Sequence, residues 1–456
     1  MEYNYIKSIE LRGIHKRYDL DIEFNSSLNI LHGQNGTGKS TLIHIIANIV
    51  NCDFIRFAFL DFSSIRLEYS SGDYVKITQY DDEENTYINV ETKSDINLQF
   101  TKRSAFEDVR ELEDERFARE FTPELTTQIK DFVKDNKIQK MESYYFPAFR
   151  TMLEAWSSRY EPRMGRVRKL PVAKVTHFAR ELFGQFLPAI NYPSPIDIEN
   201  SLRDEIRDRQ IRIARYESSV FSESFVKVFS ALLENQTNEY STENLLNEIS
   251  NLTQDSGKKS FIDFEENAQT YRRLQQLVSQ SSQFGELKST ASGALVVYRD
   301  ALKERQEFQQ KAFREIDTYF NVVNSFLDKK ELAYEQSQQR RVPRVGLKFP
   351  DGTWSSIRVM SSGERQLLTM LYAVNKMSGN SAVLIDEPEL SLHIDWQEEL
   401  LEKMMEHLGD RQIIVCTHSP SIAAGFDDYM KEVAPIFNEN LTSERDFLND
   451  ELEEDF

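Results

Sequence analysis

The chain has 456 residues, of which 40% are hydrophobic and 29% charged, and its formal net charge is −20. A strongly negative chain is repelled on average by a phosphate backbone, so broad, nonspecific adhesion to nucleic acid is disfavoured, while a local basic groove stays compatible with the charge. No run of about 18 apolar residues and no signal-peptide pattern is present, and Cys52 and Cys416 are isolated. We therefore expect a soluble, cytoplasmic protein without a disulfide framework or a zinc site.

Two alternating apolar and polar runs open the chain. Residues 6–11 and 20–24 predict an antiparallel pair of strands. Arg12, Lys16, Arg17 and Tyr18 lie on or between them. This basic and aromatic turn is either an ordinary surface turn or a contact to a bound nucleotide.

The next stretch is the most specific in the chain. An apolar strand runs into Gly33-Gln34-Asn35-Gly36-Thr37-Gly38-Lys39-Ser40-Thr41, and an apolar helical pattern follows. This is the G-x-x-x-x-G-K-[ST] phosphate loop in its required place between a strand and a helix. The glycines let successive backbone N–H groups converge on phosphate oxygens at the positive end of the helix. Lys39 is expected to reach the β- and γ-phosphates, and Ser40 to coordinate Mg²⁺.

Further strands are predicted up to residue 150. Residues 57–60 predict a strand, and residues 64–78 predict a hairpin that turns at Ser-Ser-Gly-Asp. An acidic loop at 81–84 and a charged helical stretch to about residue 140 follow. The residues from Tyr144 have a buried-strand pattern that ends at Pro147, with Arg150 just beyond. We take residues 1–150 as an N-terminal lobe.

The character of the chain changes over residues 151–341, where apolar residues recur at helical spacing among charged and amide residues. No heptad pattern is sustained, so this helical insertion is predicted to be a short bundle or hairpin rather than a long coiled-coil arm. Two basic clusters border it, at Arg159, Arg163, Arg166, Arg168, Lys169 and Lys174, and at Arg340, Arg341, Arg344 and Lys348. They indicate either an ion-paired surface or a contact with nucleic acid or an acidic protein.

A C-terminal lobe is predicted over residues 342–430, followed by an acidic tail at 431–456 that is either a solvated segment or a docking element for a basic partner. A hairpin with an Asp351-Gly352 turn leads to Ser361-Ser362-Gly363-Glu364 and a strongly helical run. The small residues that open this helix are compatible with an anion site or with a plain N-cap.

Two carboxylates follow a buried strand pattern at residues 381–385, in the position of a Walker B element. Asp386 is suited to hold the Mg²⁺ shell, and Glu387 to orient and polarise an attacking water. A last strand, at residues 412–417, ends at His418, for which we predict a γ-phosphate-sensing role.

These motifs occur in the order found in ABC-type ATPase heads and most resemble the branch containing SMC, RecF and OLD-type ATPases. The resemblance implies an α/β fold: an ABC-type P-loop ATPase head with an N-terminal antiparallel β layer and a helical insertion. It implies that the phosphate loop and Asp386 of one subunit hold ATP and Mg²⁺, while Ser361, Ser362, Gly363 and Glu364 of a second subunit close on the γ-phosphate. Glu387 matches the catalytic glutamate and His418 the switch histidine. Ser391 to His393 match the loop that joins the two sites.

The sequence departs from the family pattern in two places. Ser362 stands where many relatives have glycine, and the Q-loop glutamine is either Gln79 or is replaced by the turn at 147–150.

The layout resembles stand-alone defence ATPases such as those of the Septu (PtuA) and PARIS (AriA) anti-phage systems. The resemblance implies a slow ATPase that forms a homo-oligomer through composite ATP sites and acts as a sensor and scaffold for a separate nuclease effector. DNA or a phage protein would be its trigger. Few residues follow His418, so we expect no TOPRIM nuclease domain in this chain, and the lack of a membrane partner motif disfavours transport. The alternative is a RecF-like DNA-repair or chromosome-maintenance ATPase that acts directly on DNA.

Overall fold

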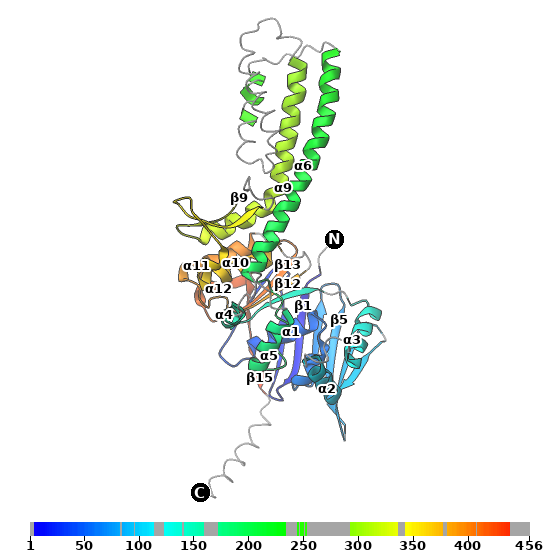
Figure 1. The fold of residues 1–456 in the computed structure, drawn as a ribbon. Helices are drawn as coiled ribbons and strands as arrows, with labels where there is room; N and C mark the ends of the chain where they lie inside the picture. The colour runs from blue at the N-terminus through cyan, green and yellow to red at the C-terminus, as the bar shows by residue number, and fades with distance from the viewer. Residues whose placement is uncertain are drawn as a thin grey trace. The chain divides into compact units, whose positions relative to one another are not determined.

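The computed structural model describes residues 4–82, 84–94, 96–113, 123–138, 141–158, 172–233, 244–245, 247–249, 251–252, 292–335, 343–376, 381–406 and 408–437. The chain divides into two compact units (Figure 1). The first comprises Met1–Ser194 and Met360–Phe456, and the second comprises Pro195–Val359.

A parallel sheet lies at the centre of the first unit, with the strand order β14-β3-β13-β12-β8. Every neighbouring pair in this order is parallel. The residues of β12 are all buried, as expected for a strand covered on both faces. The predicted strands around residues 144, 381 and 412 are confirmed. The strands are β3 (Leu28–His32), β8 (Glu142–Phe146), β12 (Ser381–Asp386), β13 (Arg411–Cys416) and β14 (Met430–Glu432).

An antiparallel sheet forms the second layer of this unit, in the order β15-β2-β1-β4-β5-β6-β7. The predicted pairing of the first two strands and the hairpin at 64–78 are confirmed. Residues 86–92 and 98–101 form its last two strands, where we predicted a loop and a charged helical stretch. The helices α2 (Lys102–Glu113) and α3 (Glu124–Asp135) begin only after these strands. The strands are β1 (Ile6–Ile14), β2 (Tyr18–Glu23), β4 (Ser64–Tyr69), β5 (Tyr74–Asp81), β6 (Thr86–Thr92), β7 (Leu98–Thr101) and β15 (Ile436–Phe437).

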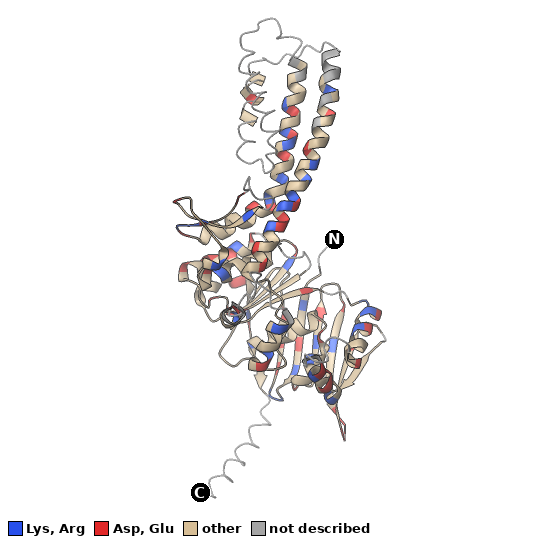
Figure 2. Cartoon of the chain, viewed as in Figure 1, with Lys and Arg blue, Asp and Glu red and all other residues tan. Residues whose placement is uncertain are grey.

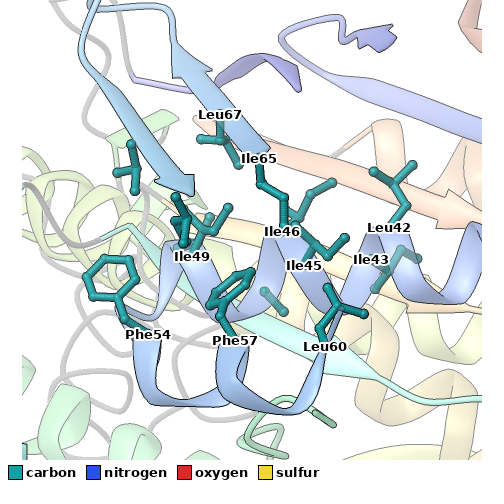
Figure 3. Close-up of a cluster of buried hydrophobic side chains, with 14 of the residues drawn as sticks. Leu42, Ile43, Ile45, Ile46, Ile49, Phe54, Phe57, Leu60, Ile65 and Leu67 are labelled. Atoms are coloured by element: carbon teal, nitrogen blue, oxygen red, sulfur yellow. The ribbon is translucent and has the colours of Figure 1, made fainter. Parts of the chain in front are cut away.

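Helix α1 (Lys39–Val50) connects the two layers. It contacts β8, β12 and β13 of the parallel sheet, and its isoleucines share one buried cluster with Ile65 and Leu67 of β4 (Figure 3). The prediction of a strand at residues 57–60 is wrong. Phe54–Phe59 form a 3₁₀ helix, η1, whose Phe54 and Phe57 point into the same cluster (Figure 3). A short apolar run has the same pattern in a buried strand and in a buried helical turn.

The other described helices of the first unit are α2 (Lys102–Glu113), α3 (Glu124–Asp135), α4 (Arg150–Ser158), α5 (Val172–Phe183), α10 (Ser362–Lys376), α11 (Ile394–Met405), α12 (Pro420–Ala423) and η3 (Asp427–Tyr429). Among the described residues, none of the helices combines the length and apolar character that a membrane span requires.

The second unit is built on α6 (Pro195–Leu233) and α9 (Ser292–Phe326), which lie side by side and run antiparallel (Figure 1). Arg305 pairs with Glu217 at 2.6 Å, and Tyr216 stacks on Phe308 with 3.9 Å between ring centroids. At 1.5 Å per residue, the 39 residues of α6 extend over roughly 58 Å, which is longer than the short hairpin we predicted. Charged residues of both signs follow one another along both helices (Figure 2).

A small antiparallel sheet, in the order β11-β10-β9, completes the second unit. Its strands are β9 (Glu331–Glu335), β10 (Arg344–Lys348) and β11 (Trp354–Ser355), and η2 (Ile357–Val359) follows. The expected hairpin with the Asp351-Gly352 turn is present as β10 and β11. The unit does not begin where the sequence placed the insertion, because Ala179, Leu187 and Ile190 are buried in the core of the first unit.

Several predicted segments lie outside the described residues. They are the basic cluster from Arg159 to Lys169, Arg340 and Arg341, and the acidic tail from residue 438 onward.

Candidate functional site

The phosphate loop follows β3 and runs directly into α1. Gly38 is the residue before the helix, with a left-handed φ of 86°, and no side chain caps the helix start. The Lys39 ammonium donates hydrogen bonds to the carbonyls of Gly33, at 3.0 Å, and Gln34, at 2.8 Å. Thr37 Oγ1 donates to the same Gln34 carbonyl at 3.0 Å. The first N–H groups of α1 thus remain available for an anion.

Parallel pairing brings the other predicted residues to the same edge of the sheet. The carboxyl ends of β3, β13, β12 and β8 lie next to one another in that order, because all four strands run in the same direction. β3 therefore delivers the phosphate loop beside His418, which follows β13, and beside Asp386, the last residue of β12. In α/β sheets, ligands bind beyond this edge of the sheet.

A cavity of about 530 Å³ opens at this edge, which is within the usual size range of ligand pockets. The structure brings nine of the predicted site residues together in its lining, and it adds three that we did not assign to the site. The predicted residues are Asn35, Gly36, Gly38, Lys39, Ser40, Thr41, Asp386, Glu387 and His418, and the additional ones are His15, Tyr18 and Cys416.

The acidic side of the cavity is formed by Asp386 and Glu387. Asp386 is 6% exposed and accepts a hydrogen bond from the Ser40 hydroxyl. Burial raises the pKa of Asp386 to about 6, and the hydrogen bond from Ser40 opposes this rise. Across the cavity, burial lowers the pKa of the Lys39 ammonium. Glu387 follows with a positive φ of 51°, a conformation that a residue with a side chain adopts only where its surroundings hold it.

Buried Arg150 holds this strained turn. The residue is 3% exposed, and its guanidinium donates to the carbonyls of Asp386 at 3.0 Å, Glu387 at 3.0 Å and Pro388 at 3.2 Å. It also donates to the carbonyl of Pro147 at 3.1 Å. The sequence placed Arg150 beyond a strand, but the three carbonyls that it contacts in the turn at Glu387 lie more than two hundred residues away in the chain. No local pattern predicts them.

Glu389 performs a similar task for His418. One of its carboxylate oxygens accepts hydrogen bonds from Thr417 Oγ1 and from the His418 backbone N–H, both at 2.9 Å. The exposed imidazole of His418 is therefore attached to a fixed backbone at the rim of the cavity. The sequence showed Glu389 as one more acid after the strand, without a partner to distinguish it.

The turn between β1 and β2 brings His15 and Tyr18 to the cavity. The backbone at His15 has a φ of 52°, and its N–H donates to the Asp61 carbonyl at 2.7 Å. Tyr18 packs so closely on the phosphate loop that a Cβ at Gly38 would lie 2.1 Å from the tyrosine hydroxyl. Arg12 instead pairs with Asp21. Tyr18 thus contributes to the lining of the cavity, in contact with the phosphate loop.

The segment Ser361–Glu364 opens α10 as a capping box. The Ser361 N–H donates to the Glu364 carboxylate at 2.7 Å, and the Glu364 N–H donates to Ser361 Oγ at 3.3 Å. Gly363 lies against the backbone of Ser391, where a Cβ would be 2.4 Å from the Ser391 carbonyl oxygen. These four described residues are not among those that line the cavity, and Ser361 is exposed.

Of the two Q-loop alternatives, Gln79 is not among the described residues that line the cavity. Its side-chain amide lies within the antiparallel sheet layer, where it donates to the Leu60 carbonyl at 3.1 Å and accepts from the Lys102 ammonium at 3.0 Å. The turn that ends at Arg150 contacts the turn of Asp386 and Glu387 directly, through the carbonyls described above.

Comparison with known proteins gives a family. The model described as "AAA ATPase domain" matches residues 5–423. The Retron Ec83 probable ATPase of Escherichia coli is 24% identical over 145 residues, covering 28% of this chain and 27% of the relative. The Retron Vc95 probable ATPase of Vibrio cholerae serotype O1 biovar El Tor is 29% identical over 101 residues, covering 19% and 20%. The matches thus span only a small part of these relatives.

Among solved structures, the Smc head domain with an extended coiled coil, bound to the C-terminal domain of ScpA and derived from Pyrococcus furiosus, covers 98% of this chain and 99% of its own. Its identity is 13% and its TM-score is 0.39. The family model includes the phosphate loop, both carboxylates of the cavity and His418. The chain belongs to the AAA ATPase domain family.

Proposed function

We propose that this chain binds ATP with Mg²⁺ in the cavity and hydrolyses it slowly to ADP and phosphate. The observation that carries the proposal is the arrangement around the phosphate loop, where Lys39, Ser40, Asp386, Glu387 and His418 line one cavity. A site that only bound a nucleotide with its metal ion would need the carboxylate of Asp386 but no second carboxylate. Glu387 supplies that second carboxylate.

The donor set fits Mg²⁺. This ion prefers oxygen ligands and retains several waters, and a hydroxyl hydrogen-bonded to a carboxylate is what Ser40 and Asp386 present. Ser40 and Asp386 would hold the ion, which supplies charge neutralisation at the phosphates when bound. The raised pKa of Asp386 reflects burial, and a nearby cation favours its ionised form.

The other residues divide the remaining work. Lys39 exchanges its carbonyl partners in the loop for phosphate oxygens and stabilises the negative charge there. Glu387 accepts a proton from the water that attacks the γ-phosphorus, as the bond to the β-phosphate oxygen breaks. His418 donates a hydrogen bond to the γ-phosphate from the rim. Tyr18 contacts the nucleoside end.

We further propose that the site is composite, as in ABC-type heads of the SMC and RecF branch. The start of α10 carries the capping box of Ser361 and Glu364, with Ser361 exposed, and this helix end would contact the γ-phosphate held by a second copy of the chain. The exposed side chain of Leu390 and that of Ile394, 39% and 53% exposed, flank the loop from Ser391 to His393. They would be covered in the same interface.

The test is the Glu387→Gln variant of the full chain. We expect ATP binding to remain while hydrolysis falls at least about a hundredfold, because a general base contributes about that much or more. Size-exclusion chromatography with light scattering should then show an ATP-dependent dimer or larger oligomer. Lys39→Ala is the matched control and should neither bind ATP nor assemble. If Glu387→Gln binds ATP and stays monomeric, the composite site is wrong.

The biological role that we propose is a sensor and scaffold that controls a separate nuclease in anti-phage defence. It is supported by the resemblance to stand-alone defence ATPases, and two partial relatives are named retron ATPases. Purification from native cells should bring down, in stoichiometric amount, a TOPRIM or HNH nuclease encoded beside this chain. Direct DNA binding that weakens steeply with salt, without such a nuclease, would instead favour the RecF-like alternative.

A further inference from the structure

Helix α4 contacts two segments of the first unit that act on different nucleotides in the proposed oligomer. At its first residue, Arg150 donates to three consecutive carbonyls of the turn that carries Glu387. This turn acts on the ATP bound by its own chain. Since Arg150 is 3% exposed, water does not compete for these hydrogen bonds.

The residues that follow Arg150 in α4 contact the start of α10. Thr151 Oγ1 accepts a hydrogen bond from Gln366 Nε2 at 2.5 Å, and Gln366 is 3% exposed. Glu154 forms a partly buried ion pair with Arg365, whose guanidinium also donates to the Met360 carbonyl at 2.5 Å. Met360 directly precedes the capping box. This end of α10 would contact the ATP bound by the second copy.

The spacing makes α4 a stiff connection. Residues at positions i, i+1 and i+4 of a helix are held at fixed distances by its backbone hydrogen bonds. A movement of the start of α10 is passed to Glu154 and Thr151 through a hydrogen bond and an ion pair. The same helix carries Arg150. A displacement of Arg150 in turn changes the support of the left-handed backbone at Glu387.

We propose that α4 couples the two ATP sites of the oligomer, with Arg150 as the positioning residue that sets the carboxylate of Glu387 when α10 has engaged the second nucleotide. The inference rests on the proposed composite ATPase. It adds that each chain hydrolyses its own ATP only after its helix α10 has contacted the ATP bound by the partner chain. Turnover should therefore depend cooperatively on ATP concentration.

The experiment breaks and then restores the pair of Glu154 and Arg365 in the full chain. We expect Glu154→Gln and Arg365→Gln each to lower kcat at least tenfold and to reduce the Hill coefficient for ATP to one. The Kd for ATP should stay within twofold of wild type, since neither residue lines the cavity. The reversed pair, Glu154→Arg with Arg365→Glu, should recover a large part of both losses. Lys7→Gln breaks an exposed pair with Glu68 and should change neither value.

Arg150→Lys is the second variant. It keeps the buried positive charge but lacks the planar guanidinium, whose several N–H donors bind the carbonyls of the turn. It should lower kcat at least tenfold at unchanged ATP affinity. Wild-type kcat in this variant or in the two single variants would overturn the proposal, as would turnover by the wild-type chain with a Hill coefficient of one. A wild-type chain that hydrolyses no ATP would instead refute the proposed function itself.

Discussion

Replacing Gly363 by alanine tests whether the signature segment is held against the loop at Ser391. The backbone of Gly363 lies in the first turn of α10, so ordinary helical propensity favours alanine there. A Cβ, however, would lie 2.4 Å from the Ser391 carbonyl oxygen and 3.7 Å from the Trp396 ring. The first contact is shorter than real Cβ atoms show, and its partner is backbone rather than a movable side chain.

The two effects can be compared. Alanine gains roughly 0.5–1 kcal/mol over glycine within a helix, and less in its first turn. Forcing an additional carbon into a closely packed site costs typically about 1–3 kcal/mol. The steric cost therefore exceeds the propensity gain, and we expect Gly363→Ala to lower the free energy of unfolding by about 1–2 kcal/mol. The displaced loop should also lower kcat.

Urea denaturation followed by far-UV circular dichroism measures the first quantity, and steady-state phosphate release measures the second. Ser362→Ala serves as the stability control, since it lies in the same turn and adds no atom; its effect should stay within about 0.5 kcal/mol. If Gly363→Ala unfolds at higher urea than wild type and retains full kcat, α10 does not pack against Ser391 as described.

Three further predictions concern the surroundings of the cavity. Glu389→Gln replaces the charged oxygen that Thr417 and the His418 N–H share by a neutral amide oxygen, which weakens both hydrogen bonds. We expect kcat to fall about tenfold, or about 1.4 kcal/mol, at constant ATP affinity; equal kcat in phosphate-release assays would contradict this. Tyr18→Ala should weaken binding of a fluorescent ATP analogue about fivefold, because the loss of one aromatic contact costs about 1 kcal/mol. An unchanged affinity would show that Tyr18 does not contact the nucleotide. His44 makes stability depend on pH. Its ring contacts the Tyr145 hydroxyl at 2.7 Å, and burial lowers the pKa of the imidazole from 6.5 to about 4. Between these two pH values the imidazole is therefore protonated in the unfolded chain and neutral in the folded chain. The free energy of unfolding should therefore be highest above about pH 6.5 and fall by up to about 3 kcal/mol as the pH is lowered towards 4. Urea titrations at several pH values should show a flatter pH dependence for His44→Gln than for wild type.

The sequence predicted those parts of the site that consist of consecutive residues with a recognisable motif. The phosphate loop from Gly33 to Ser40 and the pair Asp386 and Glu387 each follow an apolar strand, and the structure has those strands as β3 and β12. Parallel pairing then requires that their carboxyl ends meet at one edge. The two local motifs and the parallel pairing of their strands therefore predict one shared site, and no pair of distant residues has to be known in advance.

The supporting residues could not be predicted, because their roles depend on partners far away in the chain. Arg150 follows a strand and a proline like many surface arginines, and only the neighbouring position of β12 makes it a buried donor to the turn at Glu387. Tyr18 was recognised as part of an aromatic turn, but its contact with Gly38 depends on the position of the antiparallel layer over the loop. The strand predicted at residues 57–60 failed for a local reason, since a buried 3₁₀ turn has the same apolar pattern.

The strand register makes the turn that carries Glu387 depend on a distant segment of the chain. β8 and β12 are neighbours with Phe146 opposite Ile385, although most of the chain lies between them. Because the entropy of loop closure increases by only roughly 0.6 kcal/mol for each doubling of loop length, this pairing tolerates an insertion of almost any size. A slip of one residue between the two strands would turn the side chains of β8 to the other face of the sheet and remove Arg150 from the carbonyls of Glu387 and Pro388. The conformation of Glu387 therefore depends on the register of β8 as well as on its own neighbours in the chain.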